Sequence, residues 1–420
     1  MNAEKLVVIG QGYVGLPLAM RAVEAGLDVV GLDVDSDRVK RLASGESFVE
    51  DIPTDRLGRA LSSGRYRPST EYTDAQDFDI CVITVPTPLR DGTPDLSYVE
   101  QAGLGIGPYV RPGCTVVLES TTYPGTTEDL LRPLLESASG LHSPGDFHLG
   151  YSPERIDPGN PTWRLENTPK IVSGVDAASL ARVDGFYRRL VERTVPVDST
   201  RVAELTKLIE NTFRQVNIAL INELAMVSHH LGIDAWQAID AASSKPFGFM
   251  PFRPGPGVGG HCLPIDPCYL SWQVKRTLGR PFRFIELADD INHQMPEHVT
   301  GRVMAGLNRI GRPVNGARLL LLGLAYKRNT GDMRDSPAVD VAKRFQALGA
   351  EVRAVEPYAE PQHIPGGVVV VDLTEREVAA ADAVVLVTDH DCFDYDLVTR
   401  HARYVFDTRA RCRGEMVERL

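Results

Sequence analysis

A loop rich in glycine and proline, residues 253–266, carries the residues best suited to covalent chemistry. Four glycines and two prolines precede Cys262 in the run Arg253-Pro-Gly-Pro-Gly-Val-Gly-Gly-His-Cys262. Glycines leave backbone amides free to face an oxyanion or a phosphate, and a cysteine held among them can become a reactive nucleophile. Asp266, four residues later, could orient a water molecule or a neighbouring lysine. A buried structural cysteine is the alternative, and the loop by itself favours that simpler interpretation.

A second polar group lies on a stretch that is otherwise apolar. Lys207 and Asn211 are four residues apart, so a helix places them on one face, and Glu204 and Gln215 extend the same polar stripe. The alternative is a solvated helix face, but such a face is usually richer in charged residues than this stretch. The spacing therefore favours a functional pair.

The third feature is the turn Gly10-Gln-Gly-Tyr-Val-Gly15, which follows a short apolar run and opens an amphipathic stretch. The first glycine permits the tight bend, the second lets a pyrophosphate approach the backbone, and the third lets the helix pack on the strand. Asp33 lies at the end of the second predicted strand. A carboxylate there can accept from both ribose hydroxyls and repels a 2'-phosphate, so the turn predicts binding of NAD and not NADP. A glycine turn used only for packing is the alternative.

The hydrophobic pattern predicts the elements that must position these groups. Over roughly the first 190 residues, short apolar runs alternate with amphipathic stretches, which predicts a doubly wound α/β domain with a mostly parallel sheet. Its runs are residues 6–9, 28–32, 80–85, 114–118 and 147–151. From residue 318 a second α/β domain begins, with runs at 319–322, 351–355, 368–371 and 383–387.

Between these patterns, residues 201–231 contain neither proline nor glycine, and apolar residues recur every three or four positions. The stretch predicts one helix of about 45 Å, at about 1.5 Å per residue. A helix of that length outspans a small domain, so we expect it to join two lobes and to pack against a second copy of the chain in a homodimer or a higher homo-oligomer. A loop over residues 246–267 and a further helix near 284–307 follow.

Composition and charge restrict the class of protein. No run of about 18 apolar residues is present, and residues 1–12 enter a strand pattern without a cleavable signal, so we expect no membrane segment and a cytoplasmic location. The net charge of −11 argues against a non-specific nucleic-acid surface. The six cysteines form no Cys-x-x-Cys pair, so neither a metal site nor a disulfide framework is expected.

Seven motifs occur in a characteristic order along the chain. They are Gly10-Gln-Gly-Tyr-Val-Gly15, Val85-Pro-Thr-Pro88, Glu119-Ser-Thr-Thr-Tyr-Pro-Gly-Thr126, Ser152-Pro-Glu-Arg155, Lys207-Leu-Ile-Glu-Asn211, Gly259-Gly-His-Cys262 and Gly323-Leu-Ala-Tyr-Lys327. In this combination the sequence resembles, over nearly its whole length, the UDP-glucose/GDP-mannose dehydrogenase family of nucleotide-sugar 6-dehydrogenases. The resemblance implies an α/β fold of two Rossmann-like doubly wound domains joined by a long central helix. It implies an NAD-binding domain at 1–195, a central helical dimerisation and catalytic-cysteine region at 196–305, and a UDP-binding domain at 306–420.

The resemblance also implies a reaction, in which a primary alcohol of the sugar becomes an acid through two hydride transfers to two molecules of NAD. Cys262 would trap the aldehyde as a thiohemiacetal, and the second transfer would give a thioester that water cleaves. Lys207 and Asn211 resemble the pair that stabilises the alkoxide or oxyanion. The other catalytic residues implied are Asp266, acting with Lys207 and a water, Glu154, the general base for thioester hydrolysis, and Thr121, which helps to place that water and the nicotinamide.

Binding residues follow from the same resemblance, which implies that both α/β domains serve one reaction. Arg409 resembles a C-terminal arginine near the substrate, with a surface location as the alternative. The implied NAD-binding residues are Gly10, Gly12, Tyr13, Val14, Gly15, Asp33, Arg38, Thr87, Thr121 and Arg334. The implied residues for the nucleotide-sugar substrate are Glu154, Arg155, Lys207, Asn211, Arg253, Gly259, Lys327 and Arg409.

The identity of the sugar depends on fewer residues. The segment Ser152-Pro-Glu-Arg-Ile-Asp-Pro-Gly-Asn160 departs from the Asn-Pro-Glu-Phe-Leu type of many UDP-glucose enzymes. It resembles the branch that acts on UDP-N-acetylhexosamines such as UDP-GlcNAc and UDP-ManNAc, and so does the run from Gly260 to Tyr269. One or two contacts with the C2 substituent decide this specificity, so UDP-glucose and dTDP-glucose stay open as substrates.

Two other kinds of protein share part of the pattern. A hydroxyacid dehydrogenase of the 6-phosphogluconate type also places a lysine and an asparagine on the helix after a dinucleotide-binding domain, but it needs no cysteine nucleophile and no third nucleotide-binding region. A non-catalytic sensor of NAD or of a nucleotide sugar would be expected to lose Cys262, Lys207 or Asp266, and all three are present. We therefore expect an enzyme.

Overall fold

A computed structural model of the chain describes residues 4–49, 51–157, 160, 162–260 and 263–420. The chain divides into two compact units, Met1–Glu210 and Asn211–Leu420. The division falls within one long helix, α7 (Thr200–His230). The three regions expected from the sequence, with boundaries after residues 195 and 305, stay a prediction.

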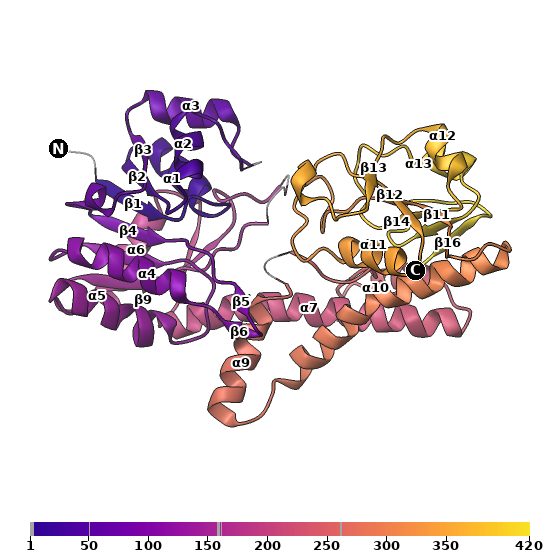
Figure 1. Ribbon diagram of the computed structural model, residues 1–420. Helices are drawn as coiled ribbons and strands as arrows, with labels where there is room; N and C mark the ends of the chain where they lie inside the picture. The colour runs from indigo at the N-terminus through magenta and orange to yellow at the C-terminus, as the bar shows by residue number, and fades with distance from the viewer. Residues whose placement is uncertain (1–3, 50, 158–159, 161, 261–262) are drawn as a thin grey trace. The chain divides into compact units, whose positions relative to one another are not determined.

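The first unit is built on an eight-stranded sheet with the order β10-β9-β8-β7-β4-β1-β2-β3 (Figure 1). The strands are β1 (Lys5–Ile9), β2 (Asp28–Leu32), β3 (Tyr66–Ser69), β4 (Ile80–Ile83), β7 (Thr115–Leu118), β8 (His148–Tyr151), β9 (Lys170–Gly174) and β10 (Thr194–Pro196). All neighbours are parallel except β8 and β9, which are antiparallel. This arrangement confirms the predicted mostly parallel sheet.

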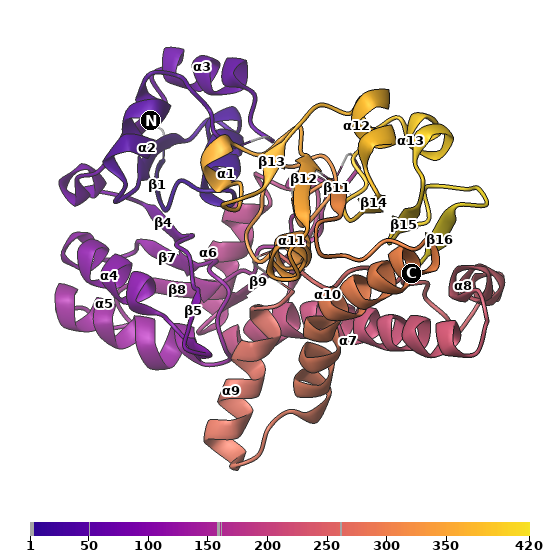
Figure 2. The same cartoon turned by 45° about the vertical axis from the view of Figure 1, so that its right-hand side comes forward.

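Helices of the first unit cover the sheet, so the central strands are buried and consist of continuous apolar residues. Helix α1 packs on β1 and β2, α6 packs on β7, β8 and β9, and α4 packs beside α5 (Figure 2). The bounds are α1 (Gly15–Glu24), α2 (Ser36–Ala43), α3 (Thr54–Ser62), η1 (Tyr72–Ala75), α4 (Ser97–Ile106), η2 (Gly107–Tyr109), η3 (Thr127–Leu131), α5 (Arg132–Ser139) and α6 (Ala177–Tyr187), with a small hairpin of β5 (Leu89–Arg90) and β6 (Thr93–Pro94).

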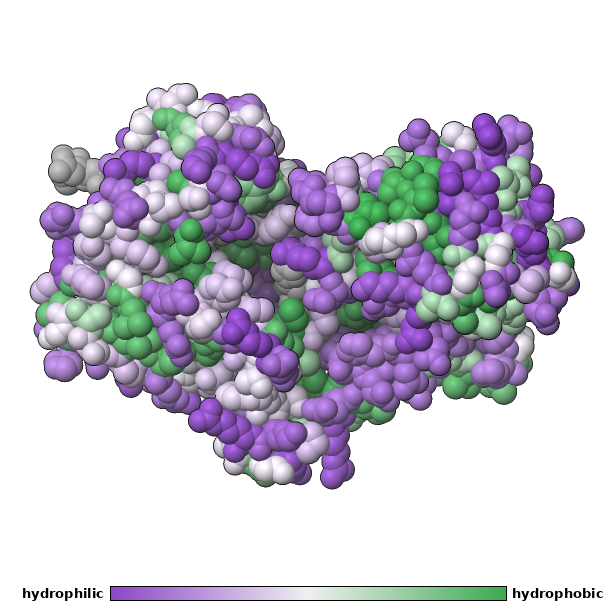
Figure 3. All heavy atoms as spheres, in the orientation of Figure 1, coloured by the Kyte–Doolittle hydropathy of each residue, from purple (hydrophilic) through white to green (hydrophobic). Residues whose placement is uncertain are grey.

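The second unit contains a six-stranded, fully parallel sheet with the order β13-β12-β11-β14-β15-β16. Its strands are β11 (Arg318–Leu322), β12 (Glu351–Val355), β13 (Val369–Val370), β14 (Ala383–Leu386), β15 (Val405–Asp407) and β16 (Val417–Arg419). Its helices are α11 (Pro337–Ala347), η4 (Pro361–His363), α12 (Glu375–Ala380) and α13 (Tyr395–His401). Figure 3 shows hydrophobic surface over the edge strand β13, whose two valines are about half exposed. This unit confirms the predicted second α/β domain.

Long helices complete the second unit: the last part of α7, then α8 (Ala235–Ser243), α9 (Asp266–Leu278) and α10 (Arg283–Arg309). Helix α10 packs on α11, and Asn222 of α7 donates a hydrogen bond of 3.0 Å to Asn292 of α10. The loop predicted to extend to Pro267 is wrong by two residues, because α9 begins at Asp266. Proline is tolerated in the first turn of a helix, where its missing amide has no helical partner.

The apolar stripe that predicted α7 is largely exposed in the single chain. Seven of its residues have exposed fractions between 36% and 55%: Val202, Leu205, Ile209, Phe213, Leu220, Leu224 and Val227. Such a stripe on one helix exceeds what isolated surface side chains present. Among the described residues, no helix combines the length and hydropathy needed to cross a lipid bilayer.

Candidate functional site

The glycines of the turn after β1 have two different roles. Gly10 has a φ of +93°, and a Cβ there would lie 2.8 Å from the backbone oxygen of Thr84. A Cβ on Gly15 would lie 1.8 Å from the backbone oxygen of Gly10, so neither glycine tolerates a side chain. A Cβ on Gly12 would meet nothing within 4 Å. The fold requires the first and third glycines, whereas the second leaves open space in which a pyrophosphate can approach the backbone.

Asp33 follows β2 and is buried beside the glycine turn. One carboxylate oxygen accepts from the backbone amide of Gln11 at 2.8 Å and from the guanidinium of Arg38 at 2.9 Å, and the other accepts from the amide of Asp35 at 3.0 Å. The arginine is partly exposed, while the carboxylate is not. The predicted ribose ligand is therefore held in one orientation, next to the predicted adenosine neighbour Arg38.

The carboxyl ends of β4 and β7 lie at the same sheet edge as this turn, where open α/β sheets bind their ligands. Thr87 follows β4, and Thr121 follows β7 and is half-buried. The next residue, Thr122, is fully buried, and its hydroxyl has no hydrogen-bond partner among the described residues. The sequence analysis did not single out Thr122, and a buried hydroxyl without a hydrogen-bond partner is uncommon in a folded protein.

Glu154 lies in the loop after β8, and its polar atoms have several partners within the first unit. Carboxylate oxygen Oε1 accepts from the amides of Arg155 at 2.6 Å and Ile156 at 2.5 Å, and Oε2 lies 3.3 Å from Nζ of Lys170. Nζ of the buried Lys207 donates to the main-chain oxygen of Glu154 at 2.6 Å. The structure therefore brings together two residues that the sequence assigned separately to catalysis.

The rest of the predicted polar stripe on α7 is divided among several contacts. The carboxylate of Glu204 is buried and accepts from the amides of Gly125 and Thr127 and from the Thr127 hydroxyl. Burial raises the pKa of Glu204 to about 7 against the effect of these hydrogen bonds. Glu204 thus holds the loop before η3. Arg155 forms an ion pair of 2.6 Å with Glu210 on the same helix.

The second unit contains the other candidate catalytic contact. Nδ2 of Asn211 donates to the buried carboxylate of Asp266, the first residue of α9, at 2.5 Å. Cys262, the predicted nucleophile, lies outside the described residues. The glycines before it lie against the first turn of the second sheet. A Cβ on Gly259 would lie 2.5 Å from the backbone oxygen of Asp335, and one on Gly260 would lie 2.7 Å from the ring of Tyr326.

The predicted substrate arginines have different surroundings. A Cβ on Gly255 would lie 2.9 Å from Nη1 of Arg409, whose Nε donates to the backbone oxygen of Val387 at 2.8 Å. Arg409 is half-buried against the glycine loop and not on an open surface. Arg253 instead forms an ion pair of 2.6 Å with Asp240 and is exposed.

The two basic residues at the start of the second sheet are also placed beside this loop. Nε and Nη2 of Arg334 donate to the Asp332 carboxylate at 2.8 and 2.7 Å, and the main-chain oxygen of Arg334 accepts from the Gly260 amide at 3.2 Å. Lys327 follows Tyr326, whose amide donates to the main-chain oxygen of Asp332. Both predicted binding residues therefore lie in the segment against which the glycine loop packs.

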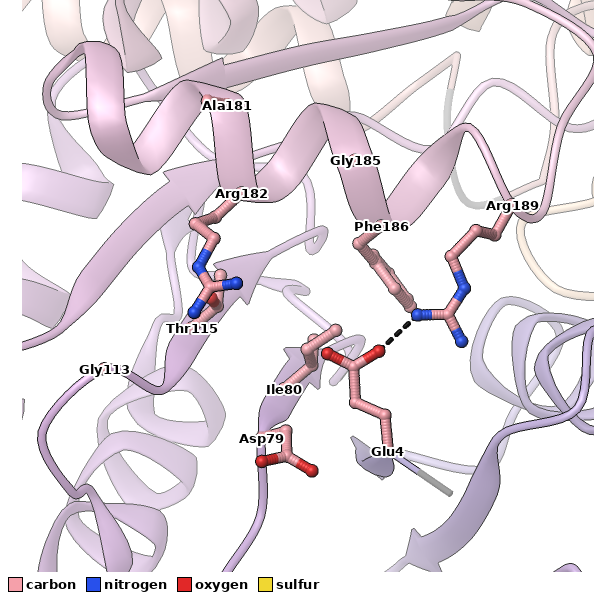
Figure 4. Close-up of a pocket in the computed structure, with 10 residues that line it drawn as sticks. All are labelled: Glu4, Asp79, Ile80, Gly113, Thr115, Ala181, Arg182, Gly185, Phe186 and Arg189. Carbon is pink, nitrogen blue, oxygen red and sulfur yellow. Dashed lines mark hydrogen bonds and ion pairs between the residues drawn. The ribbon is translucent and has the colours of Figure 1, made fainter. Parts of the chain in front are cut away.

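A cavity of about 300 Å³ in the first unit lies away from this site. Figure 4 shows its lining, which includes Ile80 at the start of β4 and Thr115 at the start of β7, with an ion pair between Glu4 and Arg189. These are the amino ends of the strands, opposite to the edge that carries the glycine turn. Across the part of the chain that the structure describes, no three His, Cys, Asp or Glu side chains are grouped as a metal site.

Comparison with known protein families gives three matches along the chain. The NAD binding domain of the UDP-glucose/GDP-mannose dehydrogenase family matches residues 4–191, its central domain matches 201–294, and its UDP binding domain matches 320–413. The matched regions follow one another in the order predicted from the motifs.

Individual proteins are similar over most of their length. UDP-N-acetyl-D-mannosamine dehydrogenase of Pyrococcus horikoshii is 37% identical over 390 residues, which cover 93% of this chain and 90% of that protein. UDP-N-acetyl-D-glucosamine 6-dehydrogenase of Salmonella typhi is 36% identical over 394 residues, covering 93% and 90%. The solved structure of UDP-D-ManNAc dehydrogenase from Pyrococcus horikoshii has a TM-score of 0.89 at 34% identity and covers 99% of this chain and 98% of its own.

Proposed function

The chain belongs to the UDP-glucose/GDP-mannose dehydrogenase family, and from this premise we propose that its substrate is a UDP-N-acetylhexosamine. It is an NAD-dependent nucleotide-sugar 6-dehydrogenase, an oxidoreductase that converts the C6 primary alcohol of the sugar to a carboxylate. The names of the two relatives refer to UDP-N-acetylmannosamine and UDP-N-acetylglucosamine. Together with the Ser-Pro-Glu-Arg segment, these names support an N-acetylated sugar over glucose.

One observation carries the assignment of the catalytic residues. Lys207 and Asn211 are one turn apart on α7, and each contacts another candidate catalytic residue: Lys207 contacts Glu154, and Asn211 contacts Asp266. An ammonium and an amide so placed can donate hydrogen bonds to a developing oxyanion, which is the largest single contribution in many acyl-transfer reactions.

In the proposed mechanism the chain supplies a nucleophile, two oxyanion donors and a base. NAD, when bound, accepts the hydride in each of the two oxidation steps. The sulfur of Cys262 bonds to the aldehyde carbon to form a thiohemiacetal, and oxidation of that adduct gives a thioester. Lys207 and Asn211 donate to the substrate oxygen, while Asp266 and Thr121 orient water. Glu154 then takes a proton from the water that attacks the thioester carbon.

The residues of the first unit fit a dinucleotide. The open space at Gly12 admits a pyrophosphate, and the oriented carboxylate of Asp33 suits a ribose without a 2'-phosphate. Arg38 would lie beside the adenosine. The other residues proposed to contact NAD are Gly10, Tyr13, Val14, Gly15, Thr87, Thr121 and Arg334.

Several of the proposed substrate contacts are basic side chains. Arg409 lies against the glycine loop, which suits it to the nucleotide part of the substrate. Arg253 would leave its ion pair with Asp240 and contact the substrate instead. The other proposed contacts are Glu154, Arg155, Lys207, Asn211, Gly259 and Lys327.

The exposed stripe of α7 supports a homodimer, since seven apolar side chains on one helix need a partner surface. The proposed regions are the NAD-binding domain at 1–195, the dimerisation and cysteine region at 196–305, and the UDP-binding domain at 306–420. We place the protein in the cytoplasm, because the reaction uses NAD and a nucleotide sugar.

The substrate is tested by incubating the purified protein with NAD and, in parallel, UDP-GlcNAc, UDP-ManNAc, UDP-GalNAc, UDP-glucose and dTDP-glucose. NADH absorbance and the mass of the product are followed in each reaction. We expect two NADH per sugar and a carboxylate product, with one of the N-acetylated sugars as the fastest substrate. Faster turnover of UDP-glucose or dTDP-glucose would overturn the proposed substrate class.

A further inference from the structure

The first unit buries a small ionic cluster beside Glu154 that the mechanism above does not use. We propose that Lys170 is a positioning residue that orients the Glu154 carboxylate for thioester hydrolysis, and that Glu119 and Tyr187 tune its charge. The proposal rests on the proposed role of Glu154 as the base.

Lys170 reaches this place because β8 and β9 pair in antiparallel orientation. It is the first residue of β9, and β9 runs opposite to β8, with Tyr151 paired to Ser173. The start of β9 therefore lies at the same edge as the carboxyl ends of β7 and β8. A parallel strand would have placed its first residue at the opposite edge, away from Glu154.

The contacts within the cluster are close and almost free of solvent. Nζ of Lys170 lies 3.0 Å from the Glu119 carboxylate and 3.3 Å from that of Glu154. The Tyr187 hydroxyl donates to Glu119, and the Tyr187 ring centroid is 5.3 Å from Nζ. The side chains of Lys170, Glu119 and Glu154 have exposed fractions of 3%, 0% and 12%, so Glu154 is the member that a ligand can reach.

The cluster has more negative than positive groups, because two carboxylates share one ammonium. Burial opposes the charge of Lys170, yet its two acidic neighbours raise the pKa of Lys170. Burial also raises the pKa of Glu119, against the influence of Lys170. The ammonium thus stays charged and attracts both carboxylates.

A base must be oriented and also able to accept a proton. Besides the cluster, the charged groups near Glu154 include Lys207, on its main-chain oxygen, and the neighbouring Arg155, which is paired with Glu210. Without Glu119, the charge of Lys170 would act on Glu154 alone and make proton uptake harder. Glu119 therefore offsets part of the charge that positions the base.

Hydrolysis replaces the carbon–sulfur bond of the thioester with a carbon–oxygen bond. Glu154 takes one proton of the attacking water, and the water oxygen forms a bond to the thioester carbon. The carbon–sulfur bond breaks with its electron pair on the sulfur of Cys262, which leaves a carboxylic acid and a thiolate. Lys170 contacts neither water nor substrate and acts only through Glu154.

The test uses the full-length enzyme with NAD and its best sugar, and it follows the pH dependence of kcat together with the intact mass of the protein. For Lys170→Met we expect kcat to fall about tenfold or more, with the uronyl thioester accumulating, because the base is no longer oriented. The acidic limb of the kcat profile should move to higher pH, since the ammonium no longer attracts the carboxylate. Lys170→Arg should restore most of kcat.

Glu119→Gln should shift the acidic limb of the kcat profile in the opposite direction. Removal of its negative charge leaves Lys170 to act on Glu154, so the acidic limb should move to lower pH. The double variant Lys170→Met/Glu119→Gln should return toward the wild-type limb, and it removes the charge imbalance that could prevent Lys170→Met from folding. Ser173→Ala is the matched control on β9, because Ser173 is buried and donates only to the Tyr151 backbone at 2.7 Å. It should leave the pH profile unchanged.

Two failures can be told apart. If Lys170→Met and Glu119→Gln change only the melting temperature, as we expect for Ser173→Ala, the proposed positioning role is wrong. If Glu154→Gln itself hydrolyses the thioester at the wild-type rate, the base assignment under the proposed function is wrong. Support for the inference requires that Glu154→Gln accumulates the thioester and that the two single variants shift the limb in opposite directions.

Discussion

The turns after the first strands of the two sheets are held by equivalent hydrogen bonds, but they differ in the open space and the backbone donors that they offer to a ligand. Gly10 follows β1 with a φ of +93°, and Gly323 follows β11 with a φ of +80°. The amide of Gly10 donates to the oxygen of Leu32 at the end of β2, and that of Gly323 donates to Val355 at the end of β12. In each sheet a carboxylate then follows that second strand.

The difference lies in the two residues after the first glycine and in the reach of the carboxylate. Asp33 accepts from one turn amide, that of Gln11, and Gly12 faces open space. Glu356 is longer and accepts from both turn amides, those of Leu324 at 2.6 Å and Ala325 at 3.0 Å. The second turn thus satisfies internally the donors that a phosphate would need. The same frame can bind a dinucleotide in one unit and serve as structure in the other.

The largest expected effect comes from replacing the glycine at the start of each turn. In Gly10→Ala the Cβ would lie 2.8 Å from the Thr84 oxygen, and in Gly323→Ala it would lie 2.4 Å from the Thr388 oxygen, at a positive φ in both cases. We expect each variant to lose about 3 kcal/mol or more of unfolding free energy. Urea unfolding followed by circular dichroism measures the loss. A wild-type midpoint for either variant would mean that its turn is not required.

A substitution at Gly12 should show that the first turn binds NAD. Gly12→Ala adds a methyl group where no protein atom lies within 4 Å, so stability should change by less than about 0.5 kcal/mol. NAD affinity should fall by about tenfold or more, because the methyl occupies the space proposed for the pyrophosphate. Calorimetric titration with NAD measures the effect.

The matched control for that variant is Ala325→Gly, at the equivalent position of the second turn. Ala325 is fully buried, so its loss should cost about 1 kcal/mol of stability and leave NAD affinity unchanged. Equal NAD binding by Gly12→Ala and wild type would remove the functional distinction between the turns.

The sequence predicted the shared frame because the strands concerned are buried on both faces. Continuous apolar runs such as those of β1 and β11 are recognisable without the fold. The edge strand β3 was not predicted, because it contains Arg67 and Pro68, which are typical of an unpaired edge. Helix α9 was not predicted, because its second residue is a proline and the next expected helix began only near residue 284.

The parts of the candidate site whose residues share a sequence motif could be predicted. The parts whose residues are distant in sequence and come together only in the folded chain could not. Gly10 and Asp33 belong to a local strand–turn–helix–strand pattern, so their proximity follows from sequence. Lys170 meets Glu119 and Tyr187, which are 51 residues before it and 17 after it, only because of the order and direction of β7, β9 and α6. Hydrophobic periodicity contains no information on that order.

The last prediction concerns the carboxylate that closes the second turn, and it has the smallest effect. Burial tends to raise the pKa of Glu356, but the hydrogen bonds from His390 and the turn amides prevail, so the pKa lies below its usual value of 4.5. A carboxyl with a lowered pKa stabilises the folded state above its unfolded-state pKa, and that contribution disappears as the pH falls through the folded-state pKa. Wild-type stability should therefore decrease below about pH 4.5 partly through Glu356.

Glu356→Gln removes this titration, so its unfolding free energy should be lower than that of wild type by about 1 kcal/mol at pH 7 and should converge with it in acid. Unfolding by urea at a series of pH values measures the difference. NAD affinity should not change, whereas Asp33→Asn, the same chemical change at the first turn, should weaken NAD binding. If Glu356→Gln instead weakened NAD binding as much as Asp33→Asn, the two turns would be alike in function and the contrast between them would fail.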